Sequence, residues 1–135
     1  MMPSRAADAD ATRTLLVDAN IERGRLLTEQ LNHAGFRSDF AMTWGAAGAA
    51  LGLGHYKSCV VIADLDRAED LEHLRVLRIA APRVWVLAVT EADARQVRDP
   101  GIDSNVDALL CTPFSVRDLT VTLSEFSGRP RRVDR

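Results

Sequence analysis

Apolar and polar positions alternate regularly along the chain from Arg13 onward. Short apolar runs, the first at residues 15–17, are separated by stretches in which apolar side chains recur at helical spacing. This alternation occurs five times, and it is typical of parallel strands joined by crossover helices. The pattern therefore predicts an α/β fold of the doubly wound (βα)5 type, with a five-stranded parallel sheet covered by helices on both faces.

The make-up of three expected strands indicates where they lie in this sheet. Residues 59–63 and 84–89 are continuously apolar, as expected for strands buried on both faces, so we place them at the centre. Residues 36–42 mix polar and apolar side chains, and one face or edge of that strand can therefore contact water. We place this strand at the edge of the sheet.

Capping residues mark the starts of three helices. Asn20 can cap the first helix. Thr90 with Asp93 fits the Ser/Thr-x-x-Asp pattern, in which each side chain can bond to the backbone of the other residue, and Ser115 with Asp118 fits it too. We therefore expect one helix after Thr90 and the last helix after Ser115.

Length and composition indicate one globular domain. The chain has 135 residues, of which 47% are hydrophobic and 27% charged. These values suit one ordinary domain and exclude a disordered or fibrous class. We expect the folded part to span residues 13–127, preceded by a flexible segment at 1–12 and followed by a flexible basic tail at 128–135.

Charge and hydropathy exclude two classes of partner. The net charge of −2 gives no basic field for a nucleic acid, so we expect none to bind within this chain, although the tail around Arg131 is locally basic. No apolar run reaches the roughly 20 residues that cross a bilayer, so we expect no membrane contact and a cytoplasmic location. Cys59 and Cys111 lie in apolar runs, which favours buried, reduced thiols over a disulfide or metal site.

Acidic residues follow two of the expected strands. Asp18 comes at the end of the first strand, and Asp64 and Asp66 follow the third. Because ligands of doubly wound sheets bind beyond the carboxyl ends of the strands, we expect these carboxylates to meet at one edge. The alternative is structural: an acid after a strand commonly caps the next helix or is solvated, and for Asp64 alone both interpretations stay open.

This arrangement resembles the receiver domain of response regulators in two-component signalling. In that family, acids follow the first strand, a phosphoacceptor aspartate follows the third, and Lys-Pro-Phe follows the fifth. The resemblance places Asp18 on the first acid, Asp64 on the phosphoacceptor, and Asp66 on the residue whose backbone carbonyl binds Mg²⁺. Pro113 and Phe114 match the Pro-Phe pair. The resemblance also implies a flavodoxin-like sandwich with strand order 2-1-3-4-5.

Four positions depart from the pattern of this family. Ala19 stands in place of the second acid, Ala88 in place of a Thr or Ser, and Thr112 in place of the lysine. Leu109 replaces the aromatic residue of the switch. We therefore expect a degenerate phosphorylation pocket.

These departures weaken the binding of a metal and of a phosphoryl group. Mg²⁺ is a hard cation that prefers oxygen ligands, and with one acid missing Asp18 and Asp64 would hold it weakly. The missing lysine removes a cationic contact to the phosphoryl oxygens. Lys57, at the other end of the third strand, lies about 23 Å from Asp64 and cannot replace it. Arg67 could swing toward a phosphoryl group, but a solvated side chain is favoured for it. Thr90 could supply a hydroxyl if the fourth strand extends that far, but helix capping is favoured for it.

The four departures together motivate an atypical receiver, or pseudo-receiver. Such a domain signals through protein contacts, with weak or absent phosphorylation at Asp64, and it is not an enzyme. Its partners would be a histidine kinase or a downstream effector. A second copy of the chain could also bind, through the surface formed by the fourth helix, the fifth strand and the fifth helix.

Two alternatives stay open. The first is a working phosphoacceptor at Asp64 that depends on Mg²⁺ held by Asp18. The second is a small-ligand binding module or enzyme of flavodoxin-like architecture. The first strand-to-helix turn argues against this second alternative, because it has no glycine-rich stretch to cradle a phosphate and presents carboxylates where an anion would bind.

Overall fold

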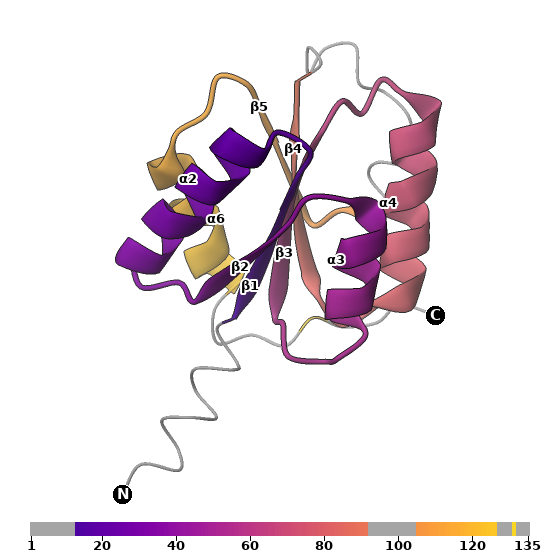
Figure 1. Cartoon of the computed structure of the whole chain (residues 1–135), viewed down its shortest axis with the longest axis horizontal. Helices are drawn as coiled ribbons and strands as arrows, with labels where there is room; N and C mark the ends of the chain where they lie inside the picture. The colour runs from indigo at the N-terminus through magenta and orange to yellow at the C-terminus, as the bar shows by residue number, and fades with distance from the viewer. Residues whose placement is uncertain (1–12, 92–104, 127–130, 132–135) are drawn as a thin grey trace, which may run out of the picture.

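The computed structural model describes residues 13–91, 105–126 and 131, which form a parallel sheet between two layers of helices (Figure 1). The strands are β1 (Thr14–Asp18), β2 (Ser38–Ala41), β3 (Ser58–Ala63), β4 (Trp85–Thr90) and β5 (Ala108–Cys111). The helices are α2 (Ile21–His33), α3 (Trp44–Leu51), α4 (Ala68–Ala80) and α6 (Val116–Phe126). The strands lie in the order β2-β1-β3-β4-β5 and all pairs are parallel, which confirms the predicted fold class.

Some sequence-based expectations fall outside the described residues. These are the end segment 1–12, the tail 128–135 apart from Arg131, and the helix expected after Thr90 together with its capping residue Asp93. The helix expected between β4 and β5 therefore stays a prediction.

The strand positions follow the polarity of their residues. β3 and β4 lie inside the sheet and almost all of their residues are buried, as their continuous apolar runs predicted. β2 lies at one edge, again as predicted, although it is shorter than residues 36–42. β5 forms the other edge, and all of its residues are only half-buried.

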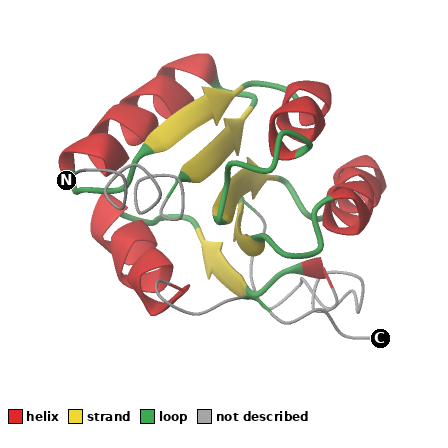
Figure 2. Ribbon diagram, turned by 90° about the horizontal axis from the view of Figure 1, so that it is seen from below, coloured by secondary structure: helices red, strands yellow, loops and turns green. Residues whose placement is uncertain are grey.

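Two pairs of helices cover the two faces of the sheet. Helices α2 and α6 pack on one face, and α3 and α4 pack on the other (Figure 1). Figure 2 shows the same two layers from below. Successive side chains of a strand point to opposite faces, so Leu15 and Val17 pack under α3 and α4, whereas Leu16 packs under α2 and α6. A sheet buried on both faces therefore requires the apolar runs seen in the sequence.

Side-chain caps fix the starts of α2 and α6. The Asn20 side chain accepts a hydrogen bond from the Arg23 backbone N–H at 3.1 Å, as predicted. The Ser115 and Asp118 side chains each accept from the other residue's backbone N–H, at 3.1 and 2.8 Å, and so form the predicted capping box. Thr90, which we expected to cap a further helix, is the buried last residue of β4, and the helix it would cap lies outside the described residues.

A charged cluster closes the amino ends of β4 and β5. Arg78, buried at the end of α4, donates to the Val84 carbonyl and to the Asp107 carboxylate, both at 2.8 Å. Arg131 binds the same carboxylate at 2.9 and 3.0 Å and donates to the Pro82 carbonyl at 2.6 Å. Only 15% of the Arg131 side chain is exposed, so this residue of the expected solvated tail is anchored against the domain.

The two cysteines are free thiols, as expected from their apolar surroundings. Cys59 is fully buried, and burial raises the pKa of its thiol to about 12, so the thiol is neutral and unreactive at neutral pH. Cys111 is half-buried. Within the described parts of the chain, no helix combines the length and apolar character needed to span a membrane.

Candidate functional site

A cavity of about 500 Å³ lies beyond the carboxyl ends of β1 and β3. Because these two strands are neighbours in the sheet, the residues that follow them meet at one edge. The charged residues of the described lining are Asp18, Arg23, Asp64, Arg67, Asp70 and Glu91. The predicted meeting of carboxylates at this edge is therefore present, together with Arg67, for which solvation was favoured, and Arg23, which was not expected there.

Asp18 is the most deeply buried acid at this edge, with 1% of its side chain exposed. Both of its carboxylate oxygens bind Arg23: Oδ2 accepts from Nε at 2.7 Å, and Oδ1 accepts from Nη2 at 2.8 Å. Oδ1 also accepts from the Asn20 backbone N–H at 3.0 Å. The hydrogen bonds that Arg23 donates to Asp18 raise the pKa of Arg23 above its ordinary value, so this guanidinium stays charged at any practical pH.

Sequence reasoning missed Arg23, although one signal could have found it. Asn20 caps α2, so Arg23 is the third residue of that helix. A side chain at this position typically reaches back to the chain before the helix, as in the capping box. Here the chain before the helix holds Asp18, and the arginine pairs with it.

Asp64 lies in the turn between β3 and α4 and is half-buried. Its Oδ1 accepts from the Asp66 backbone N–H at 3.1 Å, and its backbone carbonyl accepts from Arg67 N–H at 3.1 Å. The carboxylate therefore stabilises its own turn and also faces the cavity, so the two interpretations of Asp64 are compatible. Asp66 is exposed and is not part of the described lining.

β4 ends at Thr90, one residue beyond the end that its apolar run predicted at Val89. Ala88 is fully buried in the core and does not reach the cavity edge. Thr90 ends the strand, pairs with Ala63 of β3, and its hydroxyl accepts from the Leu65 backbone N–H at 3.2 Å. The hydroxyl at the carboxyl end of β4 is therefore that of Thr90. The sequence placed the end of this strand at Val89 because the apolar run ends there, while a buried threonine can continue a strand and so supply the hydroxyl, as was considered for Thr90.

The loop after β5 brings no cation to this edge among the described residues. Thr112 is exposed, and its backbone N–H donates to the Thr90 carbonyl at 3.1 Å. Leu109 is half-buried and packs against the core beneath α3 and α4. Arg67, which lines the cavity from the turn after β3, is 62% exposed and pairs with exposed Glu69 at 3.5 Å, a contact of little strength.

The residues at this edge do not suit the expected weak Mg²⁺ site at Asp18, Asp64 and the Asp66 carbonyl. Mg²⁺ needs oxygen ligands in a nearly octahedral shell. Arg23 occupies both oxygens of Asp18, and Ala19 supplies none. Across the described residues, no three His, Cys, Asp or Glu side chains are placed to hold a metal ion together.

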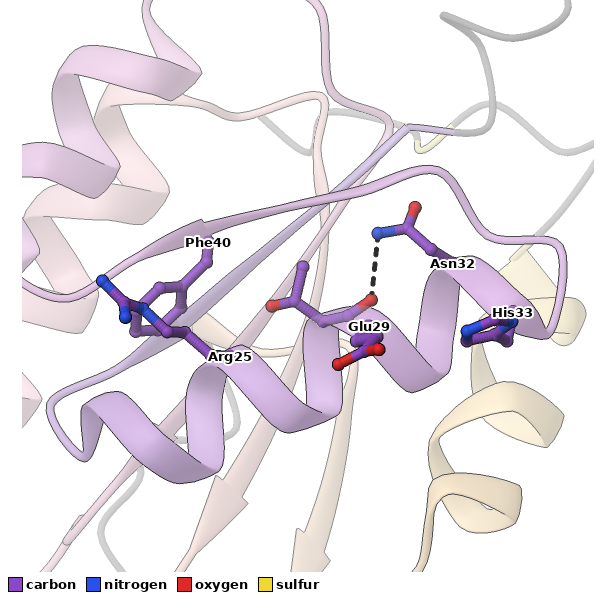
Figure 3. Close-up of a pocket in the computed structure, with 6 residues that line it drawn as sticks. Arg25, Glu29, Asn32, His33 and Phe40 are labelled. Carbon is purple, nitrogen blue, oxygen red and sulfur yellow. Dashed lines mark hydrogen bonds between the residues drawn. The ribbon is translucent and has the colours of Figure 1, made fainter.

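A second hollow of about 520 Å³ lies between α2 and the edge strand β2 (Figure 3). Figure 3 shows Arg25, Glu29 and His33 along α2, with Phe40 of β2 behind them. Asn32 uses its side chain here to join helix and strand: it donates to the carbonyls of Thr28 and Ser38 and accepts from the Ser38 N–H. The Asn32 amide and the Thr28 hydroxyl, which donates to the Gly24 carbonyl, thus serve the local structure of this hollow.

The strand order and the acidic edge together define a receiver-type α/β domain. No protein-family model matches the chain. The transcriptional regulatory protein QseB of Haemophilus influenzae is 30% identical over 117 residues, which are 87% of this chain and 53% of that protein. The receiver domain of the Francisella response regulator 1452 superposes with a TM-score of 0.74 at 17% identity, over 85% of this chain and 95% of that one.

A further similar structure is the receiver domain of a sensor histidine kinase from Pseudomonas aeruginosa PAO1, with a magnesium ion coordinated in its active-site cleft. It has a TM-score of 0.74 and 19% identity, over 87% of this chain and 98% of that one. The resemblance predicted from the sequence is confirmed: the chain is similar in sequence to a response regulator and has the fold of response regulator receiver domains. It spans about half the length of the curated relative that it matches.

Proposed function

We propose that this receiver domain acts in two-component signal transduction as an atypical receiver, through protein contacts, with weak or absent phosphorylation at Asp64. The observation that carries the proposal is Thr112, which is exposed after β5 where the family has a lysine. Stabilising charge on the phosphoryl oxygens is the main task of a phosphoryl-transfer site. A threonine hydroxyl supplies no charge for that task.

The acids of the pocket support the same function. Ala19 removes one carboxylate, and Asp18 is neutralised by Arg23. Among the described residues, no group of three acids, histidines or cysteines is then left to hold a metal ion beside Asp64. A switch needs a ligand that binds its two states with different affinity, and a phosphoryl group with few contacts provides little difference. The proposed role is therefore non-enzymatic and depends on recognition.

A working phosphoacceptor is the second candidate, and one contact favours it. The Thr90 hydroxyl lies at the carboxyl end of β4 and binds the backbone N–H of Leu65, the residue directly after Asp64. A hydroxyl so close to the acceptor could contact a phosphoryl group. The family's Thr or Ser position is thus better assigned to Thr90 than to Ala88, which leaves Ala19, Leu109 and Thr112 as the degenerate positions.

The partners that we propose are proteins: a histidine kinase, a downstream effector, or a second copy of the chain. The surface for a second copy would combine β5 and α6 with the helix expected between β4 and β5, which lies outside the described residues. Two features support it. β5 is an edge strand with half-buried residues, and Val121 on α6 is 51% exposed.

Amide NMR spectra with added Mg²⁺ and then beryllofluoride, a mimic of a phosphoryl group on aspartate, test this function. We expect no saturable shifts at Asp64 or Thr90 and no changes on β5 and α6. The Asp64→Asn variant is the control and should give the same spectra with and without the mimic. Shifts that start at Asp64, spread to α6 and disappear in the variant would establish the working phosphoacceptor instead.

A further inference from the structure

We propose that Arg23 is a resident cation of the pocket, which occupies Asp18 in place of a divalent metal. This inference rests on the proposed atypical receiver and states which cation balances the negative charge of its pocket. The cation belongs to the chain itself, so the charge at this edge of the sheet does not depend on the concentration of Mg²⁺.

The geometry at Asp18 carries the inference. The Arg23 guanidinium meets the carboxylate with two parallel hydrogen bonds of 2.7 and 2.8 Å, the strongest arrangement for an arginine and an acid. The carboxylate is 1% exposed and the arginine 31%, so water screens the pair only in part. A metal at Asp18 would have to displace this guanidinium, and Mg²⁺ also gives up its own water reluctantly.

The backbone holds Arg23 in this position. Its N–H donates to the Asn20 side chain that caps α2, and the Asn20 N–H donates to Asp18. The end of β1, the cap and the first turn of α2 thus form one closed set of hydrogen bonds. The side chain needs little further ordering to reach the acid, which favours the pair over a mobile ion.

Arg23 also connects a second strand end. Its Nη2 donates to Glu91 Oε1 at 3.1 Å, and Glu91 directly follows β4. Glu91 is 49% exposed, so this contact is weaker than the one to Asp18. The guanidinium still joins the edge at β1 to the point where the chain leaves β4, a connection that a metal bound to Asp18 and Asp64 would not provide.

Arg25 offers a matched control. It is an arginine of the same helix, two residues further on, and it is exposed on the hollow between α2 and β2 (Figure 3). The comparison uses ¹⁵N-labelled wild type, Arg23→Ala and Arg25→Ala, each titrated with Mg²⁺ through the millimolar range. The amides of Ala19 and Asp64 and the Nε–H of Arg23 are followed by NMR.

We expect no saturable Mg²⁺ shifts in the wild type or in Arg25→Ala, and an Arg23 Nε–H signal that persists at every concentration. Arg23→Ala should gain saturable binding at Ala19 and Asp64, at least about tenfold tighter than in the wild type, because the Asp18 oxygens become free. A folded Arg23→Ala variant without this gain would overturn the inference.

The wild-type signal decides the question even if the variant does not fold. Loss of the Arg23 Nε–H resonance on adding Mg²⁺, with shifts at Ala19, would show that the metal displaces the arginine and would overturn the inference. Phosphoramidate without metal separates this inference from the proposed function. Transfer of a phosphoryl group to Asp64 under these conditions would overturn the atypical role and support Arg23 as the working cation.

Discussion

At the amino end of the sheet, burial and one acidic neighbour determine the protonation of a single side chain, Tyr56. The Tyr56 hydroxyl donates to Asp39 Oδ2 at 2.6 Å, and Arg13 pairs with the same carboxylate at 3.0 Å. Burial raises the pKa of Tyr56 to about 12, and the hydrogen bond to Asp39 adds to the effect. Both causes favour the neutral phenol, so the native state binds its proton more tightly than the unfolded chain does.

This shift predicts a loss of stability at alkaline pH. The unfolded tyrosine has a pKa of about 10, so the contribution is complete below that pH and is lost as the pH rises toward about 12. Urea unfolding at a series of pH values should show this decline, and Tyr56→Phe should reduce it; the decline that remains belongs to the buried Cys59 thiol, whose pKa is raised in the same direction. Tyr56 is the chain's only tyrosine, so phenolate absorbance reports its titration directly. An ordinary pKa measured this way would contradict the prediction.

At the scale of secondary structure, the approach of α2 to the edge strand depends on one glycine. A Cβ atom on Gly24 would overlap the ring of Phe40 in β2, with Phe40 Cε1, Cζ and Cδ1 all too close. Gly24 is buried and is the fourth residue of α2, a helical position where glycine is otherwise unfavourable. The close contact of helix and strand therefore explains a residue that helix propensity would reject.

Gly24→Ala should accordingly destabilise the domain by about 1–3 kcal/mol, because the Phe40 ring has to leave its position. Gly48→Ala is the matched control within α3, since a Cβ there meets nothing within 4 Å. We expect that variant to gain roughly 0.5–1 kcal/mol from helix propensity. Urea unfolding of both proteins gives the comparison, and equal effects of the same sign would refute the packing argument.

At the scale of the whole molecule, Asp107 holds together parts of the chain that are distant in sequence. Its carboxylate accepts from Arg78 of α4, from Arg131 of the tail and from the Val86 backbone N–H of β4. Burial lowers the pKa of Arg78, which shows how much this guanidinium depends on its acceptors. The end of the sheet opposite the candidate site is therefore closed by one acid, with 13% of its side chain exposed, between two arginines.

Asp107→Asn should destabilise the protein by about 3 kcal/mol, because it leaves the buried Arg78 without a counter-charge. Glu72→Gln is the control, since Glu72 also pairs with an arginine of α4, Arg75, but in full contact with solvent. That change should leave stability nearly unchanged, because solvent screens an exposed ion pair. Thermal or urea unfolding distinguishes the two, and a loss at Asp107 as small as that at Glu72 would mean that the cluster contributes little.

The fold was largely predictable because its signals are local and repeated. Continuous apolar runs can be read without knowing what packs on them, and the caps at Asn20 and Ser115 are contained within four residues. The boundary of β4 was less accessible, because Thr90 is polar and its burial depends on its neighbours in the sheet. The site was predictable in part: the order of Asp18 and Asp64 along the chain, with parallel strands, was enough to bring them to one edge.

By itself, the sequence determined the class of fold, the acids at the strand ends and the absence of the lysine at Thr112, because each of these is a matter of residue type and spacing. Only the tertiary structure decided which partners those acids have. It paired Asp18 with Arg23 and anchored Arg131 on Asp107. Ion pairs depend on the direction of long side chains and on the exclusion of water, and both are set by packing between elements that the sequence lists far apart.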